Sequence, residues 1–250
     1  MAVAFGIMIP FLGTVIGAAC VFFLRREMNP GIRSALSGFA GGIMVAASVW
    51  SLLIPAIERA SALGQLAFLP AAGGCLLGAL LLLLADRFVP TVTLRETGWE
   101  EHRMLFAITL HNLPEGMAVG AAFAGALAGN GGLGITAATV LAIGVAVQNV
   151  PEGAIVSMPL RGRGMSAGKA FYLGALSGAV EPIGAAITLL AASVILPILP
   201  VLLGFAAGAM LYVVVEELIP EMSEGEHSHV GTIMFMVGFM MMMVLDTVLG

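Results

Sequence analysis

A six-residue motif that is rich in metal-binding side chains occurs twice in the sequence. Residues 111–116 read HNLPEG, and residues 148–153 read QNVPEG, 37 positions further on. In each copy the first and second residues lie four and three positions before the glutamate, so the three side chains share one helix face. The candidate metal-binding residues are therefore His111, Asn112 and Glu115 in the first copy and Gln148, Asn149 and Glu152 in the second. Imidazole and carboxylate groups gathered in this way suit a divalent transition-metal ion.

The surroundings of both motifs are apolar. Of the 250 residues, 60% are hydrophobic and only 10% are charged, and the mean hydropathy is +1.06. A soluble domain carries about 25% charged residues, so the composition indicates an integral membrane protein. The net charge of −5 excludes nucleic acid and anionic lipid headgroups as partners, because both require basic clusters.

Apolar runs long enough to cross a bilayer, about 20 residues each, occur eight times. The expected fold is all-α, with one transmembrane domain over residues 1–250 and short loops. The first run lacks a preceding basic residue and a cleavage site, so we expect a retained span and not a signal peptide. The predicted spans are 3–24, 34–56, 67–88, 104–127, 133–158, 167–192, 197–219 and 229–249.

Basic residues predict the orientation of these spans. Of the ten Lys and Arg residues, only Arg59 falls in an even-numbered loop. The others follow span one (Arg25, Arg26, Arg33), span three (Arg87, Arg95, Arg103) or span five (Arg161, Arg163, Lys169). By the positive-inside rule these three loops are cytoplasmic, and both termini face outward.

The polar residues of both motifs are expected near the middle of the membrane. At 1.5 Å per residue, counting from Arg103 and Arg161 places Glu115 about 18 Å deep and Gln148 about 20 Å deep. Glu181, counted from Lys169, lies about 18 Å deep. Because spans four and five run antiparallel, Gln148 should lie level with Glu115, and Glu152 level with His111.

Three carboxylates at this depth need a counter-charge. No Lys or Arg lies within the apolar core of any span, so each carboxylate must be protonated or must meet a bound cation. Hydrogen bonding between helices alone is the weaker explanation for a whole cluster. Pro114 and Pro151 remove backbone donors and are expected to kink spans four and five, and irregular backbone at this depth is tolerated where it lines a cavity.

The ligand types indicate which metal is bound. Imidazole with carboxylates suits Zn²⁺, Fe²⁺, Mn²⁺ or Co²⁺, whereas Ca²⁺ and Mg²⁺ prefer oxygen ligands alone. The main hypothesis is a carrier of divalent metal ions. The alternative is a membrane-embedded metal-dependent hydrolase. A carrier of an organic solute is less well supported, because no arginine lies in the apolar core to bind an acid group.

Other acidic and histidine residues lie near the ends of the spans. Glu216, Glu217 and Glu221, with His227 and His229, form a candidate exit at the inner end of span seven. Glu58 and Asp246 form a candidate entrance at the outer ends of spans two and eight. Each group could equally be a set of solvated charges at the membrane edge.

The paired motifs resemble the signature of the ZIP (Zrt/Irt-like protein) family of metal transporters. HNLPEG on the fourth span, QNVPEG on the fifth and Glu181-Pro182 on the sixth carry this resemblance. Residues 212–221 (YVVVEELIPE) and the ending MMMVLDTVLG are most similar to the bacterial GufA-like branch.

The resemblance implies a fold and an activity. It implies eight helices in a 3+2+3 inverted-repeat arrangement, alternating access, and uptake of Zn²⁺, or of Cd²⁺, Fe²⁺ or Mn²⁺, across the cytoplasmic (inner) membrane of a bacterium. It implies a transporter, not an enzyme, with no resident cofactor, in a lipid bilayer and commonly as a homodimer. It also implies a two-metal centre: His111, Glu115, Gln148 and Glu152 at one position, and Asn112, Asn149 and Glu181 at the other, with Glu115 and Glu152 bridging.

Overall fold

The computed structural model of the protein describes residues 2–23, 29–88, 100–129, 134–162, 164–223 and 229–249. Within these ranges, the side chains of residues 2, 86, 88, 100–111 and 249 also lie outside the description. All regular structure among the described residues is helical. The α-helices are α1 Ala2–Gly6, α2 Ile9–Ala19, α3 Pro30–Ala47, α4 Ile54–Arg59, α5 Phe68–Phe88, α6 Glu100–Leu127, α7 Ile135–Gly162, α8 Ala167–Ser177, α9 Val180–Leu190, α10 Ala192–Ile195, α11 Leu199–Val213, α12 Ile219–Met222 and α13 Val230–Leu249. Shorter 3₁₀ and π segments join them: η1 Cys20–Phe22, η2 Ser48–Leu53, η3 Ser61–Leu66, η4 Leu196–Ile198 and η5 Val214–Leu218.

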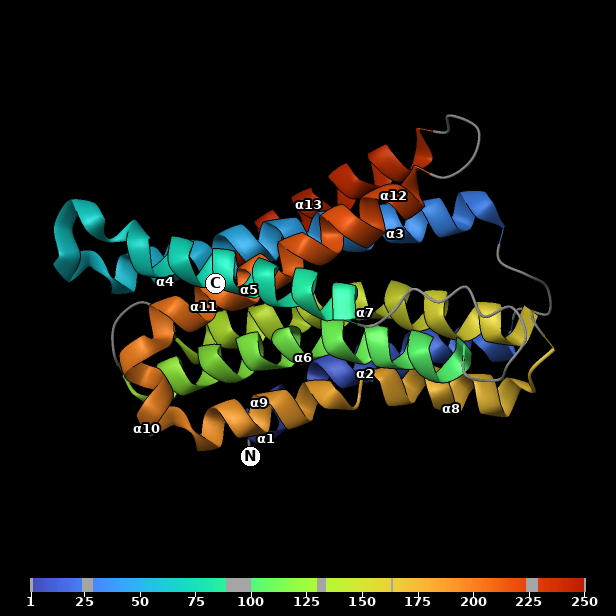
Figure 1. The fold of residues 1–250 in the computed structure, drawn as a ribbon, viewed down its shortest axis with the longest axis horizontal. Coiled ribbons are helices and arrows are strands. Elements are labelled where there is room, and N and C mark those ends of the chain that lie inside the picture. The colour runs from blue at the N-terminus through green and yellow to red at the C-terminus, as the bar shows by residue number, and fades with distance from the viewer. Residues whose placement is uncertain are drawn as a thin grey trace.

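The helices form two layers that run along the long axis of the molecule (Figure 1). One layer contains α3, α4, α5, α11 and α13, with α3 packed on α13 and α5 packed on α11. The other contains α2, α6, α7, α8 and α9, with α2 packed on α7 and α6 packed on α9. Contacts of α3 with α7 and of α11 with α6 join the layers. The two sequence motifs lie on α6 and α7 and therefore belong to the second layer.

The packing of the helices is symmetric. The main packed pairs remain the same when α2 is exchanged with α8–α9, α3 with α11, α5 with α13, and α6 with α7. For example, the pair of α3 and α13 becomes the pair of α11 and α5, and both pairs are observed. Both chain ends lie in the half of the molecule that holds the α4–α5 turn (Figure 1). The start of α3, the end of α7 and the start of α8 lie at the opposite end.

The exchange of α3 with α11 also matches a local irregularity. Each helix passes into a π-helical segment, η2 or η5, and then into Ile-Pro at Ile54-Pro55 or Ile219-Pro220. In both places the isoleucine N–H donates to the carbonyl five residues earlier, of Val49 and Val214 respectively. A proline offers no N–H to the carbonyl four residues before it, and a widened turn accommodates that loss.

Seven apolar segments in the described part of the chain are long enough to cross a membrane. They are Val3–Phe22, Pro30–Arg59, Phe68–Ala85, Ile135–Gly162, Ala167–Leu190, Ala192–Met222 and Val230–Val248. The remaining predicted span, 104–127, falls on α6, a helix of 28 residues, but side chains 100–111 lie outside the description, so an eighth span stays a prediction. The protein is thus a polytopic helical membrane protein.

Two of the predicted spans are interrupted by turns in the structure. Span 3–24 is divided into α1, α2 and η1, and span 167–192 is divided into α8 and α9 by a turn at Gly178 and Ala179. By contrast, α6 and α7 continue as single helices through Pro114 and Pro151, so the prolines do not interrupt the two motif helices. Among the three helices that carry the predicted ligands, the interruption therefore lies in span six, directly before Glu181.

Candidate metal centre

Five of the seven predicted ligands are buried in the second layer. Asn112 and Glu115 lie on α6, Gln148 and Asn149 on α7, and Glu181 on α9, and none has a relative exposure above 2%. The helices that carry them are neighbours, since α6 packs on both α7 and α9. The structure therefore brings the two motifs and Glu181 together in the protein interior, as their depth and spacing predicted.

The two copies of the motif meet directly at Glu115. Gln148 Nε2 donates a hydrogen bond of 2.6 Å to Glu115 Oε1. This contact confirms the prediction that Gln148 lies level with Glu115 on the neighbouring antiparallel helix. Because the bond occupies only one oxygen of the carboxylate, the other is available to a ligand.

Glu181 has a different environment. Its Oε1 accepts from Thr14 Oγ1 at 3.0 Å, and its Oε2 accepts from Asn149 Nδ2 at 2.8 Å. The break between α8 and α9 places Glu181 in the first turn of α9, where the helix dipole favours negative charge. This carboxylate is thus stabilised by the protein itself.

Four buried oxygen atoms of the centre have no hydrogen-bond donor among the described residues. They are Asn112 Oδ1, Glu115 Oε2, Gln148 Oε1 and Asn149 Oδ1. Each belongs to a predicted ligand, and each is an acceptor, whereas the amide donors of the same side chains are used: Asn112 Nδ2 donates to the Ser177 carbonyl at 3.1 Å. Buried acceptors without donors are costly, and a cation relieves that cost. The described groups of the centre therefore offer oxygen lone pairs that suit a bound cation.

Close helix packing holds these groups in place. A Cβ atom on Gly116 would collide with the backbone carbonyl of Glu181, and one on Gly153 would collide with that of Thr14. The glycine that ends each motif therefore allows the backbone of α9 or α2 to approach the motif helix.

The two remaining predicted ligands are less well described. Glu152 is half-buried and lies one helical turn after Gln148 on α7, so it lies near the centre. His111 belongs to α6, but its side chain lies outside the described residues. Among the side chains that are described, no three His, Cys, Asp or Glu residues group closely enough to hold a metal ion, so the amide oxygens have to supply part of any coordination shell.

Thr14 was not among the candidates from the sequence, although it contacts Glu181 directly. Its partner is 167 positions away, and a single threonine in an apolar span carries no motif. The Pro10 carbonyl, which accepts from Asn149 Nδ2 at 3.3 Å, and the Ser177 carbonyl are backbone groups and leave no trace in side-chain spacing. The only available signal was that Thr14 is a polar residue in an otherwise apolar run.

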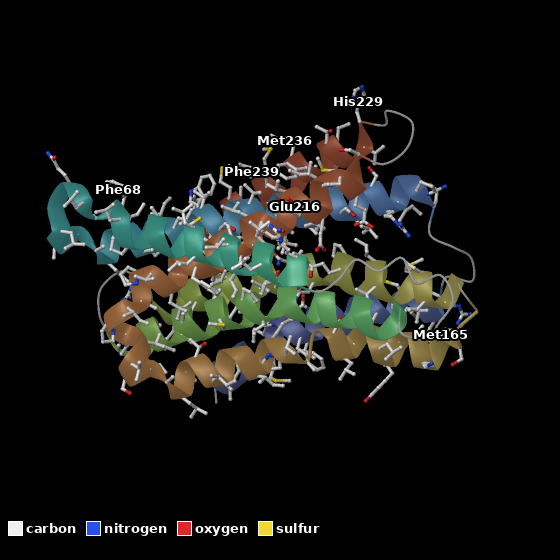
Figure 2. The ribbon with its side chains drawn as sticks, in the orientation of Figure 1. Phe68, Met165, Glu216, His229, Met236 and Phe239 are labelled. Carbon is white, nitrogen blue, oxygen red and sulfur yellow. The ribbon has the colours of Figure 1, made fainter. Side chains whose placement is uncertain are left out.

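The candidate exit residues do not form one group. Glu221 accepts a hydrogen bond of 2.7 Å from Ser37 and lies 3.7 Å from Arg33. Glu216 and Glu217 are exposed on η5, within a helix and not in a loop. Figure 2 shows Glu216 midway along the molecule and His229 apart from it, where α13 begins. His227 lies outside the described residues.

The two candidate entrance residues, Glu58 and Asp246, have different environments. Asp246 Oδ1 accepts a hydrogen bond of 2.6 Å from Ser51, and its Oδ2 is buried without a donor in the described part of the chain. Glu58 is exposed, and neighbouring Arg59 has buried Nε and Nη2 atoms for which the described residues offer no acceptor. Ser51 and Asp246 thus form a second polar site, in the first layer, without Glu58.

Apolar helices long enough to cross a membrane and a buried cluster of polar acceptors define the class of this protein as a polytopic membrane protein with a polar interior centre. Comparison with known proteins identifies the family. The sequence profile described as "ZIP Zinc transporter" matches residues 103–246. The chain therefore belongs to the ZIP family of zinc transporters. It is a transporter of divalent metal ions and not an enzyme, which excludes the alternative of a membrane-embedded hydrolase.

Similar proteins occur in bacteria and in animals. The chain is 39% identical to "Zinc transporter ZIPB" of Bordetella bronchiseptica, over 96% of this chain and 79% of that protein. It is 39% identical to "Zinc transporter GufA" of Myxococcus xanthus, over 90% of this chain and 89% of that protein. It is also 34% identical to "Zinc transporter ZIP11" of Xenopus tropicalis, over 95% and 94%. The bacterial matches agree with the GufA-like resemblance of the sequence.

Proposed function

We propose that this protein carries zinc into the cytoplasm of a bacterium through the buried centre on α6, α7 and α9. The observation that carries the proposal is the set of four buried acceptor oxygens on Asn112, Glu115, Gln148 and Asn149, which lack donors among the described residues. Such oxygens are stabilised by a desolvated cation and are costly without one. The charge of Glu152 near the same place adds to the attraction for a divalent ion.

The ligand chemistry supports a transition-metal cargo. Glu115, Gln148, Glu152 and His111 would supply two carboxylates, an amide oxygen and an imidazole nitrogen, which suit Zn²⁺ and also Cd²⁺, Fe²⁺ or Mn²⁺. The relatives named above are zinc transporters, so zinc is the cargo that we propose. Protons compete for the same groups, and we expect binding to weaken at low pH.

The mode of transport that we propose is alternating access in a 3+2+3 inverted repeat of eight helices. The symmetric packing of α2, α3 and α5 with α8–α9, α11 and α13 supports the repeat. The division into two layers supports movement of the layer that holds the centre against the other layer. The positions of Arg33, Arg161 and Lys169 support a cytoplasmic end at the start of α3 and α8, with both termini outside the inner membrane.

Further polar groups lie on the expected path. Ser51 and Asp246 would attract the cation at the outer end, since Asp246 Oδ2 is buried without a donor among the described groups. Exposed Glu216 and Glu217 on η5 would receive it on the way to the cytoplasm, whereas Glu221 is held by Arg33 and Ser37. The homodimer that the family resemblance implies would place exposed leucines of α5, such as Leu76 and Leu77, against a partner or against lipid.

Zinc flux into sealed vesicles tests the proposal. Purified protein in proteoliposomes should take up ⁶⁵Zn²⁺, and His111→Ala and Glu152→Ala should abolish or strongly reduce that uptake while the protein still assembles. Cys75→Ser, a change on α5 outside the centre, serves as the control. Undiminished uptake in both His111→Ala and Glu152→Ala would refute the assignment of the centre, and no flux in the wild type would refute transport of zinc.

A further inference from the structure

We propose that Glu181 is a fixed hydrogen-bond acceptor and not a metal ligand, and that the centre therefore holds a single ion on the Glu115–Gln148 side. This inference rests on the proposed function, because it concerns the cargo of the same centre. It assigns Thr14 as the residue that positions Glu181. It also gives Asn149 a role opposite to that of a ligand, since its amide group occupies the place of a second cation.

Glu181 accepts one hydrogen bond on each of its carboxylate oxygens. Thr14 Oγ1 donates to one carboxylate oxygen at 3.0 Å, and Asn149 Nδ2 donates to the other at 2.8 Å. Glu181 and Asn149 are fully buried, with a relative exposure of 0%, and Thr14 is 1% exposed. Charged hydrogen bonds in such surroundings are strong, so both oxygens of Glu181 are already stabilised without a metal ion.

The orientation of the Asn149 amide is determined by its neighbours. Its Nδ2 lies 2.8 Å from Glu181 Oε2 and 3.3 Å from the Pro10 carbonyl oxygen. The Pro10 carbonyl and the ionised Glu181 carboxylate can only accept hydrogen bonds, so the NH₂ end of the amide faces them. An NH₂ group repels a metal ion, so Asn149 prevents a cation from approaching Glu181 from the side of α7.

The shape of the backbone around Thr14 leaves room for this arrangement. A Cβ on Gly178 would lie 2.6 Å from Thr14 Oγ1 and 2.9 Å from Glu181 Oε1. Gly178 belongs to the turn that separates α8 from α9. The break in span six and the absence of a side chain there thus allow the hydroxyl group of α2 to reach the carboxylate of α9.

The charge balance gives the number of ions. Glu115 and Glu152 together carry the two negative charges that one divalent ion requires. The third carboxylate, Glu181, has a neutral donor on each oxygen, so a second divalent ion would have to displace both donors to bind it. The oxygens left open on Asn112 and Asn149 are neutral and therefore bind a second dication weakly.

Stoichiometry of binding tests the inference. Purified protein is dialysed against Zn²⁺, and the metal content per chain is measured by mass spectrometry. We expect one Zn²⁺ per wild-type chain and two in Asn149→Asp, which removes the NH₂ group and brings a second carboxylate against Glu181. Asn29→Asp, at the N-cap of α3, adds the same charge elsewhere and should leave one. Two ions in the wild type, or one in Asn149→Asp, would overturn the proposal.

Transport kinetics test the positioning role of Thr14. Thr14→Val removes the hydroxyl group and frees one oxygen of Glu181 to reach the ion, so that the ion binds more tightly and leaves more slowly. KM and Vmax for Zn²⁺ should fall together by roughly ten-fold, the size expected for one hydrogen bond to a charged group. Thr14→Ser should restore wild-type values, and Thr188→Val, at another buried threonine on α9, should not change them.

The outcomes separate this inference from the proposed function. Zinc flux with two bound ions per wild-type chain would contradict only the inference, and so would a Thr14→Val variant that behaves like Thr188→Val. No flux and no bound zinc in the wild type would contradict the proposed function itself. Because the stoichiometry and the kinetics use different variants, poor folding of Thr14→Val leaves the Asn149→Asp measurement decisive.

Discussion

Two polar regions of this protein hold carboxylates between packed helices, and the carboxylates have opposite environments. At the junction of α3 and α12, Glu221 has Ser37 as a donor at 2.7 Å and Arg33 as a counter-ion at 3.7 Å. At the metal centre, Glu115 has one donor, Gln148, and its second oxygen has none among the described residues. The protein supplies both a donor and a counter-ion to Glu221, whereas one oxygen of Glu115 is left open at the place where we propose that a cation binds.

The difference shows how a functional site can be distinguished from a structural one in a membrane protein. Both regions join helices that are distant in sequence, and both contain hydrogen bonds between side chains. Of the two regions, only the centre leaves acceptors without donors at zero or near-zero exposure. Such acceptors destabilise the folded protein, and a purely structural contact avoids them. Glu181, with a donor on each oxygen, lies in the centre but resembles the structural region.

The largest expected effect is that of Glu115→Gln. It removes one of the two charges that balance the ion, and removal of a charge from a buried pair costs about 3–5 kcal/mol. Uptake of ⁶⁵Zn²⁺ into proteoliposomes should fall at least about 100-fold. Thermal stability without metal should not fall, because the unpaired carboxylate oxygen is lost. Reduced thermal stability with unchanged zinc uptake would instead give Glu115 a structural role, like that of Glu221.

A smaller loss is expected for Gln148→Ala. The change removes the donor to Glu115 Oε1 and one open oxygen, but no charge. Zinc uptake should fall roughly ten-fold, which corresponds to about 1.4 kcal/mol. The matched control is Gln65→Ala, at an exposed position of η3, where uptake should be unchanged. Equal effects of the two variants would remove Gln148 from the coordination shell.

The Ser51–Asp246 pair lies between the two extremes, since Asp246 has one donor and one open oxygen. We expect Asp246→Asn to raise the KM for Zn²⁺ about three-fold with little change in Vmax, because a charge at the entrance concentrates cations without holding them during transport. The increase should shrink at high salt. A fall in Vmax without a change in KM would contradict a role at the entrance.

The smallest effect is expected at Arg33 and Glu221. Arg33→Ala, Glu221→Ala and the double variant form a cycle whose coupling energy, from thermal unfolding in detergent, should be below about 1 kcal/mol. The pair is partly exposed, with side-chain exposures of 35% and 23%, and water screens it. A loss of zinc uptake in Arg33→Ala, in correctly assembled protein, would show that this region is not merely structural.

Much of the fold and the centre could be predicted from the sequence. The fixed rise and periodicity of a helix place Glu115, Gln148 and Glu181 at similar depths, and the burial of all three confirms that they lie inside the protein. The predicted spans coincide with observed helices because bilayer thickness imposes their length and apolar composition. The expected kinks at Pro114 and Pro151 are not accompanied by any break in α6 or α7, because the rest of each long helix continues to pack against its neighbours.

What the sequence by itself determined is the membrane class, the helices and the polar layer, because these follow from local composition and helical spacing. Only the tertiary structure decided which acceptors receive a donor. Thr14 reaches Glu181 across 167 positions, Ser51 reaches Asp246 across 195, and Ser37 reaches Glu221 across 184. Such pairings depend on which helices lie side by side, and no local pattern encodes them. The division between carboxylates that the protein satisfies and those left for a cation is therefore a property of the packed bundle.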